Sequence, residues 1–165
     1  MAAEGMRQPL LLLGSCLDLC RLSLSKNMPD KVVVHTDGGA RGNPGPAALG
    51  VVLDLPQGKK TYSKFLGQAT NNVAEYQAVI FALKKLKALL GSKRSQRSTV
   101  TVLMDSELIV SQLQGEYKIK QKEFYPLFIE IWNLRQDFHS VEFYSVPREQ
   151  NREADGLVNL ALDAN

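Results

Sequence analysis

Cysteine is almost absent from this chain of 165 residues, because its only two cysteines, Cys16 and Cys20, lie close to the N-terminus. The rest of the chain cannot carry a disulfide framework, and we therefore predict a reducing location, the cytoplasm. Long apolar runs are also missing: none approaches the roughly 20 residues that span a bilayer, so we expect no membrane partner. A strong excess of one charge is absent as well, since the net charge is only +3. A polyanionic partner is therefore permitted but not required.

The N-terminal segment has a weak pattern of its own. Leu10–Cys16 loosely resembles a secretory signal, but its apolar stretch is short, and the charged residues Asp18 and Arg21 come soon after it. Met28 stands immediately before the patterned part of the chain. We therefore interpret residues 1–28 as an N-terminal extension, either a disordered one or the result of a mis-assigned start. Residues 29–165 are predicted to form a single domain.

Hydrophobic periodicity divides this domain into strands and helices. β-Branched and alternating segments predict five strands, at residues 31–36, 48–55, 60–66, 99–104 and 141–146. Apolar residues at three- and four-residue spacing predict helices at residues 74–90, 106–113, 123–138 and 152–162, the last capped by Asn151. The glycine-rich stretch 38–46 and the basic stretch 91–98 predict loops. Three successive strands followed by alternating helices and strands predict an α/β fold with a mixed sheet.

Four acidic residues occupy related places in this pattern: Asp37, Glu75, Asp105 and Asp155. Asp37 and Asp105 end strands, and the other two lie near the starts of helices. Taken singly, each has a structural explanation. Asp37 could form a turn, and Glu75 could close a capping box with Asn72. Asp105 could cap the following helix, and Asp155 could be favoured by the helix dipole. Taken together, they indicate a shared site, because sites gather beyond the carboxyl ends of parallel strands.

Mg²⁺ is the cation that best fits four such carboxylates, because it prefers oxygen ligands in octahedral geometry. Four carboxylates can hold two ions, and two ions suit the in-line hydrolysis of a phosphodiester. We therefore predict that all four acids are catalytic and metal-binding. Two Mg²⁺ ions are the predicted cofactors, with Mn²⁺ as the alternative.

The segments that carry these acids resemble the motifs of type 1 ribonuclease H, in the compact form found in archaea and some bacteria. The four segments follow one another in family order: Thr36–Pro46, Thr70–Tyr76, Met104–Ser106 and Arg148–Asp155. The resemblance implies a five-stranded sheet flanked by helices, in which the first three strands are antiparallel and the others parallel to the first. It also implies endonucleolytic hydrolysis of the RNA strand of RNA–DNA hybrids, with 5′-phosphate and 3′-hydroxyl products.

The resemblance also implies roles for single residues. Asp37 would bridge both metals, Glu75 and Asp105 would complete one metal site, and Asp155 the other. Asn43, Thr70, Asn71 and Asn72 match positions that touch the nucleic-acid backbone in relatives. We add Gly38 and Gly39 as places of close backbone approach, and Lys118, Lys120 and Lys122 as contacts to DNA phosphates. The predicted partner is an RNA–DNA hybrid, bound by a monomer.

The chain departs from the family pattern in two places. Many bacterial relatives carry a histidine in the loop before the fourth motif, whereas this chain has only His35 and His139, which we interpret as a strand residue and a surface residue. Arg148 or Glu149 could substitute for it. The basic segment 115–122 is also short. The alternatives are a broader nuclease that also cuts double-stranded RNA, a non-catalytic hybrid-binding module, and a fragment of a reverse-transcriptase polyprotein.

Overall fold

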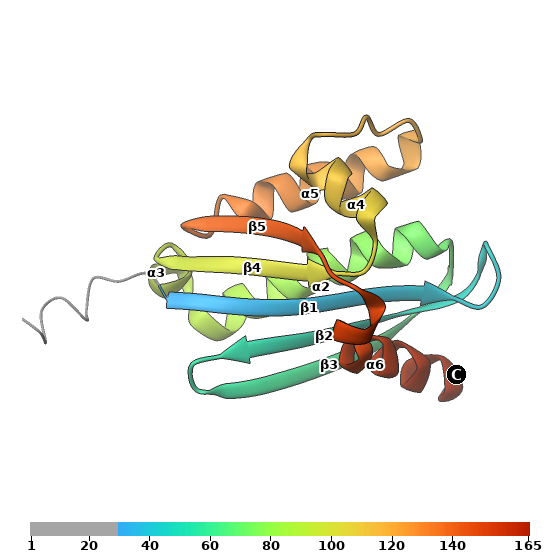
Figure 1. Cartoon of the computed structure of the whole chain (residues 1–165), viewed down its shortest axis with the longest axis horizontal. Coiled ribbons are helices and arrows are strands. Elements are labelled where there is room, and N and C mark those ends of the chain that lie inside the picture. Colours follow the sequence, from blue (N-terminus) through green and yellow to red (C-terminus); the bar gives the residue numbers. More distant parts are fainter. Residues whose placement is uncertain (1–29) are drawn as a thin grey trace, which may run out of the picture.

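A computed structural model describes residues 30–165 and has a five-stranded sheet at its centre (Figure 1). The strand order is β3-β2-β1-β4-β5. β1 is antiparallel to β2, and β2 to β3, whereas β4 and β5 run parallel to β1. The predicted sheet is therefore confirmed. The bounds are Asp30–Ala40 for β1, Gly45–Leu55 for β2, Gly58–Ala69 for β3, Ser98–Met104 for β4 and Ser140–Ser145 for β5.

Helices cover the two faces of the sheet unequally. They are α2 (Asn71–Leu90), α3 (Ser92–Ser95), α4 (Glu107–Gln114), α5 (Tyr125–Arg135) and α6 (Arg152–Asp163), with 3-10 turns at Lys122–Phe124 and Arg148–Gln150. α2 and α5 lie behind the sheet in Figure 1, and α6 lies alone in front of it. No helix within residues 30–165 is long and apolar enough to cross a membrane. The predicted N-terminal extension, residues 1–28, lies outside the described residues.

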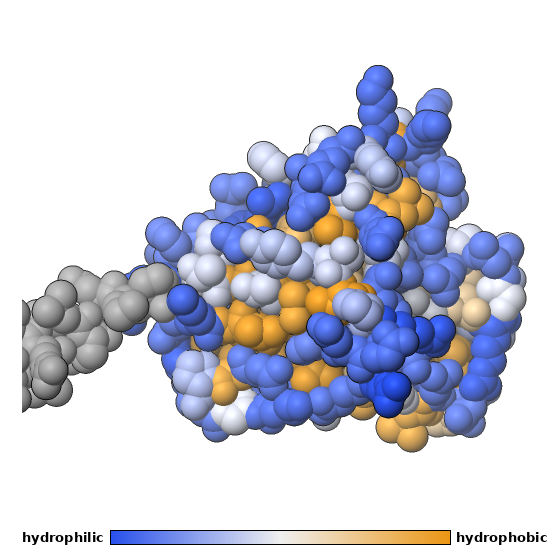
Figure 2. Space-filling model, viewed as in Figure 1, coloured by the Kyte–Doolittle hydropathy of each residue, from blue (hydrophilic) through white to orange (hydrophobic). Residues whose placement is uncertain are grey.

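The main core lies between the sheet and α2, where alternate side chains of the central strands point. Val32 and Val34 of β1, Leu49 and Val51 of β2, and Leu83 of α2 are all buried there. A smaller cluster under α6 contains Ala48, Val158, Ala161 and Leu162. Because α6 covers only one end of its face, apolar residues show on the uncovered part of the sheet in Figure 2.

Two of the predicted loops were wrong. β1 continues to Ala40 and β2 begins at Gly45, so the predicted loop 38–46 shrinks to residues 41–44. Gly38 pairs with Leu49 in the sheet. Glycine lowers strand propensity, but here the missing side chain lets a helix pack directly on the strand. The basic stretch after Gly91 contains the short helix α3.

Helix ends also differ in detail from the predictions. The predicted helix 123–138 begins as a 3-10 turn and becomes α-helical only at Tyr125, with a proline in the first turn of α5. α2 begins at Asn71, three residues before the predicted start. Thr70 caps it, because its Oγ1 accepts a hydrogen bond from the Val73 amide at 3.3 Å, and Gly91 ends the helix with φ of 73°.

Two glycines allow helix backbones to touch the sheet from opposite sides. A Cβ at Gly38 would lie 2.2 Å from the carbonyl carbon of Ala74 in α2. A Cβ at Gly50 would lie 2.2 Å from the carbonyl oxygen of Ala154 in α6. Real Cβ atoms do not tolerate such distances from backbone, so any side chain here would force the helices outward.

We expect Gly38→Ala to lower the free energy of unfolding by about 2 kcal/mol or more, because the added methyl overlaps the α2 backbone. Urea unfolding of both proteins measures this change. Gly156→Ala is the matched control: a Cβ there meets nothing within 4 Å, and alanine favours the helix α6 by up to about 1 kcal/mol. Equal stability of the two variants would show that α2 does not approach Gly38 so closely.

Candidate active site

The carboxyl ends of β1, β4 and β5 point toward the same edge of the sheet (Figure 1). Asp37 lies near the end of β1, and Asp105 follows the last residue of β4. A depression of about 520 Å³ opens at this edge, and all four predicted acids line it: Asp37, Glu75, Asp105 and Asp155. The structure therefore brings together side chains from two strands and two helices.

The glycine contacts position the two helical acids. Gly38 follows Asp37 and touches α2 at Ala74, immediately before Glu75. Gly50 pairs with Asp37 across the sheet and touches α6 at Ala154, immediately before Asp155. Each helix therefore delivers its acid beside Asp37 because its backbone rests on a glycine next to that aspartate.

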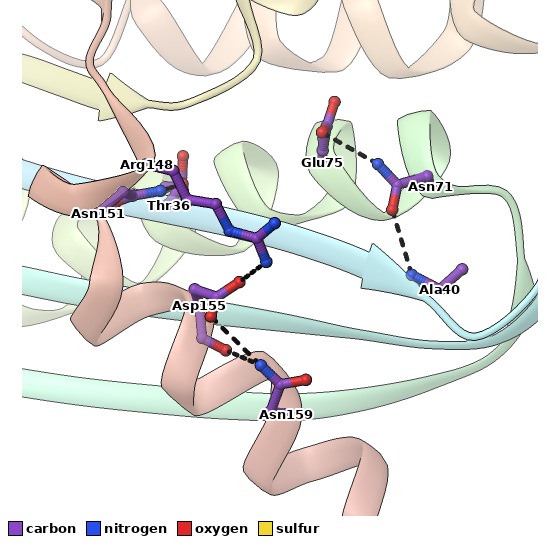
Figure 3. A network of polar contacts seen from close by, with 8 residues as sticks. All are labelled: Thr36, Ala40, Asn71, Glu75, Arg148, Asn151, Asp155 and Asn159. Carbon is purple, nitrogen blue, oxygen red and sulfur yellow. Dashed lines mark hydrogen bonds and ion pairs between the residues drawn. The ribbon is translucent and has the colours of Figure 1, made fainter.

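Glu75 is almost completely buried, with 7% of its surface exposed. Asn71 Nδ2 donates a hydrogen bond to its Oε1 at 3.2 Å, while Asn71 Oδ1 accepts one from the Ala40 amide at 3.3 Å (Figure 3). The other carboxylate oxygen, Oε2, is buried without a hydrogen-bond partner. Burial raises the pKa of Glu75 to about 7, the nearby Ser106 hydroxyl opposes the rise, and the charges of Asp37 and Asp105 add to it.

Asp37 is also buried, with 8% exposed. Burial raises the pKa of Asp37 to about 6, and repulsion by Asp105 and Asp155 contributes to the rise. The Gly38 amide and the Arg148 guanidinium oppose it. Asp37 and Glu75 are therefore each repelled by two other acids of the set, as expected of carboxylates that share one site.

Asp155 is held by polar partners on its own side of the depression (Figure 3). Arg148 donates a hydrogen bond to its Oδ1 at 2.5 Å, and Asn159 Nδ2 lies 3.3 Å from its Oδ2. Arg148 is 72% exposed, so this guanidinium can leave without disrupting the core. The sequence had identified Arg148 only as a substitute for the missing histidine.

Asn151 has a different role from the predicted one. It stands at the N-cap position of α6 but makes no capping hydrogen bond with its side chain. Its Nδ2 donates instead to the Thr36 carbonyl at 3.0 Å, and the side chain is buried. Because Thr36 precedes Asp37, this bond ties the start of α6 to the strand that carries the central acid.

The donor set fits a hard divalent cation, although it is not assembled as a finished coordination sphere. In residues 30–165 no three acidic, histidine or cysteine side chains are arranged as a ready-made metal site. Asp155 is turned toward Arg148, which explains part of this. The unpartnered Oε2 of Glu75 and the repulsion around Asp37 are the features that a cation would satisfy.

The predicted backbone contacts divide into two groups. Gly38, Gly39, Asn71 and Asn72 line the depression. Asn43 and Thr70 are not among its lining residues; Asn43 Oδ1 accepts a hydrogen bond from the Asn71 amide at 3.2 Å and so supports the rim. A sequence pattern for turns and caps does not separate these two roles.

Two of the three predicted lysine contacts line a second hollow of about 500 Å³. Lys118 and Lys120 line it, and Leu108 lines both hollows, so the two are neighbours. Lys122 lies in the 3-10 turn after this segment and does not line the hollow. The two histidines are elsewhere: His139 is exposed, and His35 Nε2 lies 3.7 Å from Asp54 Oδ2 within the sheet.

Comparisons with known proteins identify the family of this chain. Residues 35–161 match a family model described as "Reverse transcriptase-like". The chain is 33% identical over 152 residues to the ribonuclease H of Chromohalobacter salexigens, a match that covers 83% of this chain and 87% of that protein. The chain belongs to the ribonuclease H family. The predicted family is therefore confirmed.

Other members of the ribonuclease H family match over most of this chain. The bifunctional protein Rv2228c of Mycobacterium tuberculosis is 39% identical over 137 residues, 81% of this chain, but the match spans only 36% of that relative's length. LC11-RNase H1, solved in complex with an RNA/DNA hybrid, has a TM-score of 0.76 at 43% identity and covers 81% of this chain and 97% of its own. RNase H1 of Halobacterium salinarum has a TM-score of 0.73 at 35% identity, and the match covers 82% of this chain and 99% of that protein's chain.

The raised pKa values make stability depend on pH when metal is chelated. The folded form holds protons on Asp37 up to about pH 6 and on Glu75 up to about pH 7, whereas the unfolded chain releases them near pH 4. The folded protein therefore loses stability as the pH rises through this window. We expect Asp37→Asn to raise the free energy of unfolding by about 2 kcal/mol at pH 8 and by little at pH 4.

Urea unfolding in chelator at both pH values measures this difference. Glu130→Gln, an exchange of an α5 carboxylate that pairs with Lys84 outside the depression, should show no such gain. A pH-independent effect of Asp37→Asn would mean that Asp37 is not crowded by other acids.

Proposed function

We propose that this protein cleaves the RNA strand of RNA–DNA hybrids endonucleolytically, leaving 5′-phosphate and 3′-hydroxyl ends. One observation carries the proposal: four carboxylates from separate elements line a single open depression. A non-catalytic hybrid-binding module has no need for buried, mutually repelling acids. Relatives named ribonuclease H and a solved relative in complex with an RNA/DNA hybrid support the substrate class.

Two Mg²⁺ ions are the proposed cofactors, with Mn²⁺ as the alternative. Asp37, at the centre of the set, would contribute to both metal sites, Glu75 and Asp105 to one, and Asp155 to the other. Bound there, divalent cations supply activation of a water molecule and neutralisation of charge on the phosphodiester. Metal binding requires ionised carboxylates, so Asp37 and Glu75 must release any protons that their raised pKa values retain.

Arg148 has two proposed tasks at the rim of this site. While the acids are not otherwise neutralised, it compensates the charge of Asp155. Because it is largely exposed and lines the depression, it can turn from Asp155 toward a phosphate of the substrate. The guanidinium of Arg148 donates hydrogen bonds but does not release a proton at neutral pH. It would therefore position the substrate rather than transfer a proton.

Substrate choice depends on the rims of the two hollows. A hybrid differs from a DNA duplex by the 2′-hydroxyls of one strand. Asn71 and Asn72 line the depression with Gly39, and they would contact the RNA strand near the acids. Lys118 and Lys120 line the neighbouring hollow, and they would contact phosphates of the DNA strand. We also propose that the enzyme acts as a monomer. We propose the cytoplasm as its location, because residues 21–165 contain no cysteine, which fits a reducing compartment.

Asp37→Asn should abolish cleavage of a labelled hybrid in Mg²⁺ while the protein stays folded. Loss of the central charge should lower turnover by about 1000-fold, equivalent to about 4 kcal/mol. Glu130→Gln should retain turnover. The assay compares hybrid, RNA duplex, DNA duplex and single strands in Mg²⁺, Mn²⁺ and chelator, so cutting of RNA duplex would reveal the broader specificity. Near-normal turnover by folded Asp37→Asn would refute the carboxylate site.

Replacing Lys118, Lys120 and Lys122 with glutamine should weaken hybrid binding and flatten its salt dependence by about 2–3 units of slope, because fewer counterions are released. The cleavage rate at saturating hybrid should change little. A charge-matched control replaces Lys59, Lys84 and Lys87, each of which is ion-paired elsewhere on the surface. If both triple variants bind hybrid with the same affinity and salt slope, the segment does not contact the DNA strand.

A further inference from the structure

Positive charge is concentrated in one part of the chain, and most of it lies outside the carboxylate site. Residues 58–97, which form β3, α2 and α3, contain nine lysines and arginines but only one acid, Glu75. The net charge of the whole chain is only +3, so the remainder is net acidic. An uneven distribution of this kind produces a local positive potential that the overall composition conceals.

Ion pairing separates the lysines of β3 and α2 into two sets. Lys59 lies 2.6 Å from Glu153, Lys84 lies 2.5 Å from Glu130 and Lys87 lies 2.7 Å from Asp137. The second set is exposed, and no acidic side chain within residues 30–165 forms an ion pair with its members, Lys60, Lys64 and Lys85.

Two of the unpaired lysines, Lys60 and Lys64, share one face of the edge strand β3. Lys60, Tyr62 and Lys64 pair with Leu53, Val51 and Leu49 of β2, whose side chains are buried in the core under α2. Alternation along a strand therefore places these three residues of β3 on the α2 side of the sheet. Four residues of extended chain separate the two lysines by about 13 Å.

Lys85 joins this face from α2. Its Nζ lies 5.5 Å from the ring centroid of Tyr62 and 5.4 Å from that of Phe81, and the two rings pack edge to face. A cation–π contact restrains the ammonium group without cancelling its charge. Lys60, Tyr62, Lys64, Phe81 and Lys85 therefore form what we call the basic strip, with three restrained or exposed cations and no counter-charge among the described residues.

The basic strip leads to the rim of the depression but lies on the other face of the sheet. β3 ends at Ala69, directly before the cap of α2 and the rim residue Asn71. Asp37 lies on the α6 side of the sheet, because Gly50, its partner in β2, touches α6. Asp155 is part of α6 itself, whereas Glu75 reaches the same depression from α2. A duplex held at the acids is too stiff to turn around the sheet edge, since its persistence length is about 150 base pairs. An unpaired strand can turn.

We propose that the basic strip binds the phosphates of an unpaired nucleic-acid strand that continues from the hybrid held at the carboxylates. The inference rests on the proposed function for the position of the hybrid. Cations in a line beside aromatic side chains are the usual composition of surfaces that follow a single-stranded backbone. The strip would direct the enzyme to hybrids that border single-stranded regions, a preference that the carboxylate site alone cannot express.

The test measures binding by fluorescence anisotropy in chelator, so that no RNA is cut. The probes are a blunt RNA–DNA hybrid, the same hybrid with a single-stranded extension at either end, and the single strand alone. We expect the protein to bind one extended hybrid several-fold more tightly than the blunt one. Lys60→Gln/Lys64→Gln/Lys85→Gln should abolish that advantage and reduce the salt slope on the extended hybrid by about 2 units.

Three controls make the outcome specific. Replacing the paired lysines Lys59, Lys84 and Lys87 with glutamine removes the same charge and should preserve the advantage. Arginine at the three strip positions should also preserve it. Thermal melting confirms that each variant is folded.

The proposal is overturned if the strip variant keeps the advantage of the extension, or if the strip variant and the paired-lysine control weaken all probes equally. It is also overturned if the strip binds anionic vesicles but not the single strand. Cleavage of the blunt hybrid in Mg²⁺ reports separately on the proposed function, because the strip does not contact that probe. If the blunt hybrid is neither bound nor cut, loss of single-strand binding in the strip variant still tests the strip.

Discussion

The close contact of two helix backbones with two glycines is the constraint on which the site depends. Gly38 and Gly50 flank Asp37, one along the strand and one across the sheet, and their empty Cβ positions admit α2 and α6. Because the residues in contact are Ala74 and Ala154, each helix presents its next residue, an acid, to the same edge. The packing that stabilises the fold is thus also the packing that crowds the carboxylates.

This crowding has an energetic consequence. Burial and mutual repulsion raise the pKa values of Asp37 and Glu75, so ionisation of these two carboxyls costs free energy in the folded chain. Arg148 offsets part of this repulsion, and a divalent cation would offset more. Strain of this kind is typical of sites whose function requires a bound cation, since the binding energy is then available to offset the cost of assembling the acids.

The distribution of charge extends this argument beyond the acids. The carboxyl ends of β1 and β4, where the acids lie, are negative, whereas β3 and α2 carry an excess of positive charge. Ion pairs neutralise some of the lysines on that surface and leave others unpaired. This separation of acidic and basic surfaces is what the proposed function requires, because the acids would bind cations while the basic surfaces attract a polyanion.

The sequence by itself determined the order of the main strands and helices and the family, because hydrophobic periodicity and short motifs are local properties of the chain. It also singled out the four acids that line one depression in the structure. It did not predict that Gly38 lies within a strand, since a run of glycines looks the same in a loop and under a helix. It also did not predict that Asn151 binds the Thr36 carbonyl rather than capping its own helix. Only tertiary structure decided these points, and likewise which lysines are paired, because each depends on residues distant in the chain that packing brings together.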